Sequence, residues 1–185
     1  MKILGIAGSL RRDSHNARLL RAAAEMLPSG ATLELWDGLR DLPPYDEDAD
    51  REGAPASVRA LRDAIADADA ILVATPEYNA SIPGVLKNAL DWASRPYATN
   101  TLRGKPAAVV GASTGLFGAV WAQAETRKVL KTIGAHILED ELPVNLADDA
   151  FAPDGRLLDP DLRDRLADLV ADLIRETTVP VEAAA

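Results

Sequence analysis

Three short segments of the chain hold the residue types that bind phosphates and flat heterocycles. The first, residues 8–16, has the sequence GSLRRDSHN and lies directly before a helical pattern. Backbone N–H groups at a helix N-terminus, serine hydroxyls and the fixed charge of Arg11 together suit an anion. We therefore expect a phosphate here, although the segment is neither a Walker motif nor a G-x-G-x-x-G fingerprint. The alternative is that Ser14 only caps the helix and that Arg11 is solvated.

The second and third segments are suited to a flat ring. Residues 75–84, TPEYNASIPG, place an aromatic side chain and amide groups between two prolines. Such a turn can form a rigid wall that offers backbone hydrogen bonds to a heterocycle; the alternative is an ordinary strand-to-helix turn with a packed tyrosine. Residues 113–118, STGLFG, carry glycines that let the backbone approach a ligand closely.

Residues 111–115 also match the G-x-S-x-G pattern of serine hydrolases. A catalytic triad in that class needs an acid and then a histidine later in the chain, and His136 is the only later histidine. Because His136 starts a predicted strand, we expect it at the opposite end of the sheet from Ser113. The pattern therefore gives little support to a hydrolase, and we expect His15 to be a loop residue and His136 to be structural.

Composition limits the classes of function. The chain has 185 residues and a formal net charge of -9. It has no cysteine, which excludes disulfides, thiolate metal sites and cysteine nucleophiles. The negative charge disfavours nucleic acids and anionic membranes as partners. We find neither a signal-peptide pattern nor an apolar stretch of the ~18 residues that a membrane helix needs. We expect a soluble, cytoplasmic protein without a metal site, with one domain at residues 1–178 and a short tail at residues 179–185.

Hydrophobic periodicity predicts five strands that alternate with five helices. Continuous apolar runs predict three strands buried on both faces: residues 3–7, 70–74 and 107–112. Weaker runs predict two edge strands: residues 32–35 and a strand that starts at residues 136–138. Amphipathic segments predict the helices: residues 17–27, 58–68, 83–94, 119–133 and 162–174. The polar stretch between residues 37 and 55 is expected to be a loop.

Local signals support two of these helices. Ser81 is a candidate cap for the helix at residues 83–94, which also carries a Lys87/Asp91 pair at i,i+4. Gly134 is expected to end the helix before it in a left-handed conformation. Trp92 is expected to pack in the core or in an interface, and Leu86, Leu90 and Ala93 on the same helix could build a dimer surface.

This alternation predicts the α/β class, with a doubly wound, five-stranded parallel sheet and helices on both faces. The flavodoxin-like strand order 2-1-3-4-5 places the three buried runs in the middle. In such sheets ligands bind beyond the carboxyl ends of the strands, where the strand order reverses. The segments after Ala7, Ala74 and Ala112, which are the three described above, should therefore lie together.

The sequences GSLRRDSHN, TPEYNASIPGVLKNALDW and GASTGLFG together resemble the NADPH-dependent FMN reductase family, which includes quinone, chromate and azo-dye reductases. The resemblance extends from Lys2 to about Leu158 and implies a flavodoxin-like fold with non-covalently bound FMN. It implies that the phosphate is held by Ser9, Arg11, Ser14 and Asn16, with His15 beside them. It also implies that the isoalloxazine is lined by Pro76, Glu77, Tyr78 and Asn79, and on its other side by Ser113, Thr114 and Gly115.

The same resemblance implies an enzyme whose chemistry takes place on FMN, with no catalytic side chain. NADPH or NADH would pass hydride to FMN in a ping-pong cycle, and a quinone, azo, nitro, metal-oxyanion or flavin acceptor would then be reduced. A homodimer or homotetramer is implied as well, although several relatives have an aromatic residue in place of Ala80 and an arginine in place of Trp121. The alternative is a non-catalytic, FMN-bound electron carrier or redox-responsive binding protein.

Overall fold

The computed structural model describes residues 1–178, so the expected tail at residues 179–185 lies outside the described part of the chain. Five strands form one parallel sheet in the order β2-β1-β3-β4-β5. The strands are β1 Lys2–Ala7, β2 Thr32–Trp36, β3 Ala70–Thr75, β4 Pro106–Ala112 and β5 His136–Val144. The predicted flavodoxin-like topology is confirmed, and β5 extends well beyond the residues at which it was expected to start.

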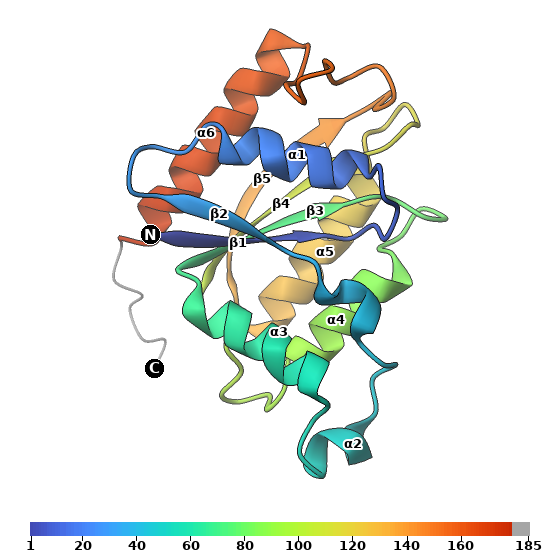
Figure 1. The fold of residues 1–185 in the computed structure, drawn as a ribbon, viewed down its shortest axis with the longest axis vertical. Coiled ribbons are helices and arrows are strands. Elements are labelled where there is room, and N and C mark those ends of the chain that lie inside the picture. Colours follow the sequence, from blue (N-terminus) through green and yellow to red (C-terminus); the bar gives the residue numbers. More distant parts are fainter. Residues whose placement is uncertain (179–185) are drawn as a thin grey trace.

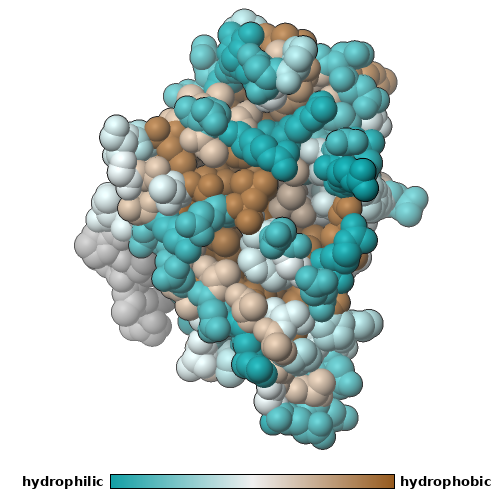
Figure 2. All heavy atoms as spheres, viewed as in Figure 1, coloured by the Kyte–Doolittle hydropathy of each residue, from teal (hydrophilic) through white to brown (hydrophobic). Residues whose placement is uncertain are grey.

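Helices cover both faces of the sheet (Figure 1). The first face is covered by α1 His15–Ala24 and α6 Pro160–Glu176, and the second by α3 Ala56–Asp67, α4 Gly84–Ala93 and α5 Val120–Ile133. Each face buries its own apolar cluster, as expected for a doubly wound sheet. Figure 2 shows hydrophilic residues over α1 and an apolar area beside it along the edge of the sheet. No helix within residues 1–178 is long and apolar enough to cross a membrane.

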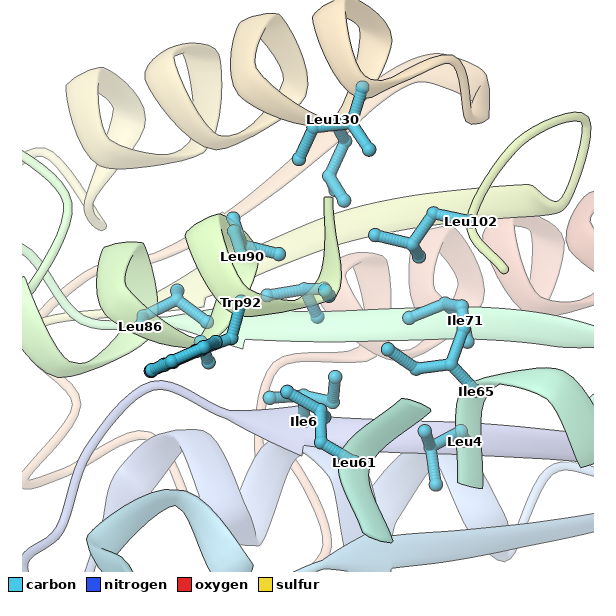
Figure 3. Close-up of a cluster of buried hydrophobic side chains, with 14 of the residues drawn as sticks. Leu4, Ile6, Leu61, Ile65, Ile71, Leu86, Leu90, Trp92, Leu102 and Leu130 are labelled. Carbon is cyan, nitrogen blue, oxygen red and sulfur yellow. The ribbon is translucent and has the colours of Figure 1, made fainter. Parts of the chain in front are cut away.

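The apolar face of α4 is directed into the core of the second face (Figure 3). Trp92 is fully buried, and its indole N–H donates to the carbonyl of Pro43 at 2.8 Å. Leu86, Leu90 and Ala93 are also buried. The expectation that these residues build a dimer surface is therefore wrong, because they pack against this chain's own sheet.

Residues 37–55 are more ordered than the predicted loop. They contain a 3₁₀ turn, Gly38–Asp41, and a short helix, α2 Glu47–Arg51. The side chain of Asp46 caps α2, and acidic residues occupy its first turn, where their charge interacts favourably with the helix dipole and stabilises the helix. Periodicity could not reveal α2 because none of its residues is buried.

Two local expectations are confirmed, at Gly134 and at the Lys87/Asp91 pair, and the start of α1 is defined by a side-chain cap. Ser14 caps α1, and its side chain accepts from the N–H of Ala17 at 3.2 Å, so the helix begins at His15 rather than at Ala17. Gly134 ends α5 with φ of 105°. Lys87 and Asp91 form the expected ion pair, with Nζ 2.6 Å from Oδ1.

Ser81 was expected to cap α4, and this expectation is wrong. The N-cap of α4 is Pro83, which makes no side-chain capping bond, and the Ser81 hydroxyl instead donates to Glu125 on α5 at 2.6 Å. The same carboxylate oxygen accepts the N–H of Ile82 at 3.2 Å. Glu125 therefore joins the segment before α4 to α5, and these two donors hold its pKa below the usual value.

We predict that Glu125→Gln lowers the free energy of unfolding at pH 7 by roughly 0.5–1 kcal/mol, a small effect because the carboxylate is exposed. The lowered pKa means that the stabilisation by the charged form is present above the pKa of the unfolded chain and is lost as pH falls through the folded value. Urea unfolding between about pH 7 and pH 3 should show the difference from wild type shrinking with acid. Glu52→Gln, at an exposed carboxyl after α2 whose side chain has no partner within residues 1–178, is the matched control; an equal effect there would contradict the prediction.

Candidate functional site

The loops after β1, β3 and β4 meet at the carboxyl edge of the sheet (Figure 1). A pocket of about 290 Å³ lies between them. Ten of the twelve site residues expected from sequence line it, together with Ala112: Ser9, Arg11, Ser14, His15, Asn16, Pro76, Glu77, Tyr78, Ser113 and Thr114. The other two, Asn79 and Gly115, do not line the pocket.

The first loop presents hydrogen-bond donors at the N-terminus of α1. Ser9 Oγ accepts the N–H of Arg11 at 3.3 Å, and the Arg11 guanidinium donates to the carbonyl of Asp13 at 2.9 Å. The N–H groups of Leu10, Arg12 and Asp13 donate to no group within residues 1–178. This set of groups is suited to binding a phosphate: unpaired N–H groups, two hydroxyls and a guanidinium beside a helix N-terminus.

Asn16 joins this loop to β4. Its side-chain amide donates to the carbonyl of Ala112 at 2.9 Å, and its side-chain oxygen accepts the N–H of Ala112 at 2.9 Å. The side chain is 2% exposed, so both bonds are shielded from water. Asn16 therefore positions the first and third loops relative to each other, whatever further contact its second amide hydrogen makes.

His15 has partners that were not apparent in the sequence. Its Nε2 lies 3.0 Å from the carboxylate of Asp148, and its ring stacks on Phe151 with 6.2 Å between centroids and 9° between planes. Its Nδ1 is buried without a hydrogen-bond partner among the described residues. Asp148 and Phe151 follow β5, and no local pattern marks them, because they are more than a hundred residues away from His15 in the chain.

The second loop is a tight turn. Tyr78 and Ser81 exchange backbone hydrogen bonds of 3.1 and 3.2 Å across it. Asn79 and Ala80 have positive φ values, 54° and 57°, which is the combination found in type I′ turns. This geometry places Asn79 at the tip of the turn, which is why it does not line the pocket.

Glu77 fixes this turn to α5. Its Oε2 accepts the N–H groups of Trp121 and Ala122, each at 3.1 Å. The cap residue of α5, Ala119, has no side chain that could accept these donors. The carboxylate of Glu77 therefore caps a helix, and its backbone is what remains for a ligand in the pocket.

The third loop folds onto the end of β5. The N–H of Ser113 donates to Val144, and the N–H of Ala147 donates to Ser113. Gly118, with φ of 57°, passes so close to β5 that an added Cβ would lie 2.6 Å from the carbonyl carbon of Pro143. Only glycine therefore fits there, and the loop is rigidly placed.

The geometry does not assemble a hydrolase triad from Ser113 and His136. His136 pairs with Pro106 at the start of β4, whereas Ser113 follows the end of that strand. His136 Nε2 lies 3.0 Å from Glu176 instead. Ser113 Oγ accepts the N–H of Gly115 at 3.1 Å, and within residues 1–178 it bonds to neither histidine.

Apolar side chains are exposed near the pocket. Tyr78 is 51% exposed, and Phe117 and Trp121 are 60% and 50% exposed. Phe117 and Trp121 make an edge-to-face contact with ring centroids 5.0 Å apart. Exposed aromatic groups at a pocket mouth suit contact with a ligand or with another protein surface.

No cluster of three or more potential metal-binding side chains occurs within residues 1–178. The groups that the pocket offers to a ligand are hydrogen-bond donors, one guanidinium and rigidly placed backbone. Such a set can hold a phosphate at one end and a flat polar ring at the other.

Comparison with known proteins identifies similar chains. The chain is 46% identical over 165 residues to an NAD(P)H-dependent FMN reductase of Pseudomonas aeruginosa, which covers 89% of this chain and 88% of that one. It is 40% identical over 164 residues to a 2-hydroxy-1,4-benzoquinone reductase of a Burkholderia species, covering 88% of each chain. Among solved structures, FerB, a flavoenzyme NAD(P)H:(acceptor) oxidoreductase from Paracoccus denitrificans, superposes with a TM-score of 0.83. The identity is 37%, and 95% of this chain and 96% of that chain are covered.

The model of one family matches residues 1–149, which include all three loops and all five strands of the sheet. That match agrees with the similar chains and with the positions of the expected site residues. The chain belongs to the NADPH-dependent FMN reductase family.

Proposed function

We propose that this protein binds FMN non-covalently between its three loops and uses NADPH or NADH to reduce small acceptors, with quinones as the first class to test. The observation that carries the proposal is the convergence of a phosphate-type donor set and two rigid loops in one pocket. The quinone class is favoured by the names of the similar proteins. Azo, nitro, metal-oxyanion and flavin acceptors are the further candidates.

The phosphate of FMN would be held by the loop before α1. The hydroxyls of Ser9 and Ser14 and the unpaired N–H groups supply donors, and Arg11 supplies charge. His15 lines the same pocket, and its buried Nδ1 has no partner within residues 1–178, so it is a further candidate contact. Asn16 would act through its two bonds to Ala112, which hold this loop against β4.

The ring of FMN would lie between the second and third loops. Pro76, Glu77 and Tyr78 form one wall, and Ser113 and Thr114 form the other. Glu77 is tied to α5, so the backbone of this wall is held in place before a ligand arrives. Asn79 and Gly115, which the resemblance also implicates, would make contact only at the margins of the ring.

FMN, when bound, supplies hydride acceptance and donation, and the chain supplies binding and orientation. We assign no side chain as a catalytic acid or base. The exposed ring of Tyr78 at the pocket mouth offers a surface on which a flat substrate can stack. NAD(P)H and the acceptor would occupy this one opening in turn, which corresponds to a ping-pong order.

We also propose that the protein forms a homodimer or homotetramer through the apolar residues near the pocket. Five exposed side chains come from the loops after β3, β4 and β5 and from the first turn of α5: Tyr78, Leu116, Phe117, Trp121 and Leu146. Solvent-exposed apolar groups gathered in this way suit burial against a second copy. Such a contact would also shelter the pocket mouth.

The proposed activity predicts a spectral cycle. FMN added to the purified protein should give a bound-flavin spectrum that NADPH bleaches without oxygen and that a quinone restores. Stopped-flow absorbance near the flavin band measures both halves. Bound flavin that neither NADPH nor NADH can reduce would instead indicate the electron carrier, and absence of flavin binding would refute the site.

Arg11→Ala is predicted to weaken FMN binding by about 1.5–3 kcal/mol, because a charge-assisted contact to phosphate is lost. Fluorescence titration of the apoprotein with FMN measures the change. Arg12→Ala removes an exposed arginine that does not line the pocket and is the matched control. Unchanged FMN affinity in Arg11→Ala would remove Arg11 from the phosphate site.

Trp121→Glu is predicted to shift the oligomer toward monomer, because a charge replaces an exposed apolar side chain in the first turn of α5. The side chain of Trp121 is half exposed and lies outside both buried clusters, so the fold should be retained. Sedimentation velocity gives the distribution of species. Leu158→Glu, at a side chain of equal exposure before α6, should leave it unchanged. A wild-type protein that sediments only as a monomer with FMN bound would contradict the oligomer proposal.

A further inference from the structure

A second cavity, of about 780 Å³, lies between α1 and the segment that leads from β5 to α6. It shares no lining residue with the pocket described above. Its size falls in the range of cavities that hold small organic molecules. Nothing in the proposed reduction of acceptors uses it.

The lining of this cavity is basic. Four arginines from two distant parts of the sequence line it, Arg18, Arg21, Arg156 and Arg163, against the two carboxylates of Glu25 and Asp154. The whole chain carries a formal charge of -9, so the charge of this cavity is opposite in sign to the net charge of the protein. A local concentration of guanidinium groups attracts anions even on an acidic protein.

One wall is a single face of α1. Arg18, Arg21, Ala22 and Glu25 follow the spacing of three and four residues that brings side chains onto one helix face. Within residues 1–178, the side chains of Arg18 and Arg21 make no hydrogen bond or ion pair, whereas most of the arginines elsewhere have carboxylate or carbonyl partners. Their charges therefore remain available to a ligand.

The opposite wall is held in place by its own contacts. Arg163 donates through Nη1 to the carbonyls of Leu157 and Leu158 at 2.9 and 3.0 Å. Arg156 has Nε 3.9 Å from Asp154, a long ion pair in which both side chains remain more than half exposed. Asp154 therefore offsets only part of the charge on this wall.

The cavity also has an apolar component. Its accessible apolar surface comes from Met26 and Pro153, whereas Ala22 and Leu157 are buried. A bare inorganic ion would leave this surface in contact with water. A ligand with both an anionic group and an apolar body would use both parts of the lining.

We propose that this cavity is a binding site for a small organic dianion, a phosphate monoester or a dicarboxylate with a flat apolar body. Arg18 and Arg21 would bind the anionic group, because guanidinium forks match the oxygens of phosphate and carboxylate. The apolar body would lie against Met26 and Pro153. Glu25, at the edge of the same helix face, would weaken binding by repulsion.

Isothermal titration of the FMN-saturated protein tests this site without interference from the phosphate end of the flavin pocket. The probes are phenyl phosphate and phthalate, with inorganic phosphate as the ion that lacks an apolar body and benzyl alcohol as the neutral ring. At about 0.15 M salt we expect one saturable site with a Kd below about 1 mM for at least one of the two dianions. Inorganic phosphate should bind several-fold more weakly, and the preferred dianion identifies the anionic group.

Variants separate this cavity from any other anion site. The double variant Arg18→Gln/Arg21→Gln should weaken binding by about tenfold or more. Arg18→Lys/Arg21→Lys should recover part of the affinity, because charge returns without the fork. Glu25→Gln should tighten binding several-fold, a gain that a damaged fold could not produce. Lys128→Gln, which removes one exposed cation on α5, is the control for overall charge and should bind as wild type does.

Three results would overturn the proposal. They are the absence of saturable binding by either dianion, an unchanged affinity in Arg18→Gln/Arg21→Gln, and an equal loss in Lys128→Gln. The last result would mean that the probes respond to overall charge rather than to the cavity. Because the readout is binding and not turnover, failure here leaves the FMN and NADPH measurements unaffected.

Discussion

The two hydrogen bonds between Asn16 and Ala112 are the contact on which the geometry of the flavin site depends. β3 ends at Thr75, opposite Gly111, so Ala112 extends one residue beyond its neighbouring strand. The buried amide of Asn16 satisfies both backbone groups of Ala112, and no water could replace it there. Because Asn16 lies in the first turn of α1, the same two bonds place the phosphate-type loop beside the loop after β4.

Two carboxylates hold the loops around the site in place by accepting hydrogen bonds from neighbouring elements. Glu77 caps α5 from the turn after β3, and Glu125 returns from α5 to the segment before α4. These two acids bond to groups of the fold, whereas the N–H groups of Leu10, Arg12 and Asp13 and the side chains of Arg18 and Arg21 have no partner within residues 1–178. An acidic protein can in this way hold phosphates, because helix N-termini and a few arginines act over short distances that the net charge does not control.

Sequence alone supported the fold and the location of the site. Three runs apolar on both faces required central strands, and two weaker runs required edges, which leaves few parallel topologies. The carboxyl ends of those strands then had to meet, so the loops after Ala7, Ala74 and Ala112 could be assigned to one site. Helix α2 was missed because it buries nothing and carries no periodicity.

What the sequence by itself determined was the five strands, the five longer helices, their order and the loops that meet, because those follow from periodicity and from local turn signals. Only the tertiary structure decided the partners of individual side chains. Ser81 bonds to Glu125 on α5, and His15 contacts Asp148 and Phe151. The arginines of α1 line one cavity with Arg156, before α6, and with Arg163, in the first turn of α6. Each of these contacts joins residues more than forty positions apart. Such pairs depend on how whole elements pack, and no local pattern records that packing.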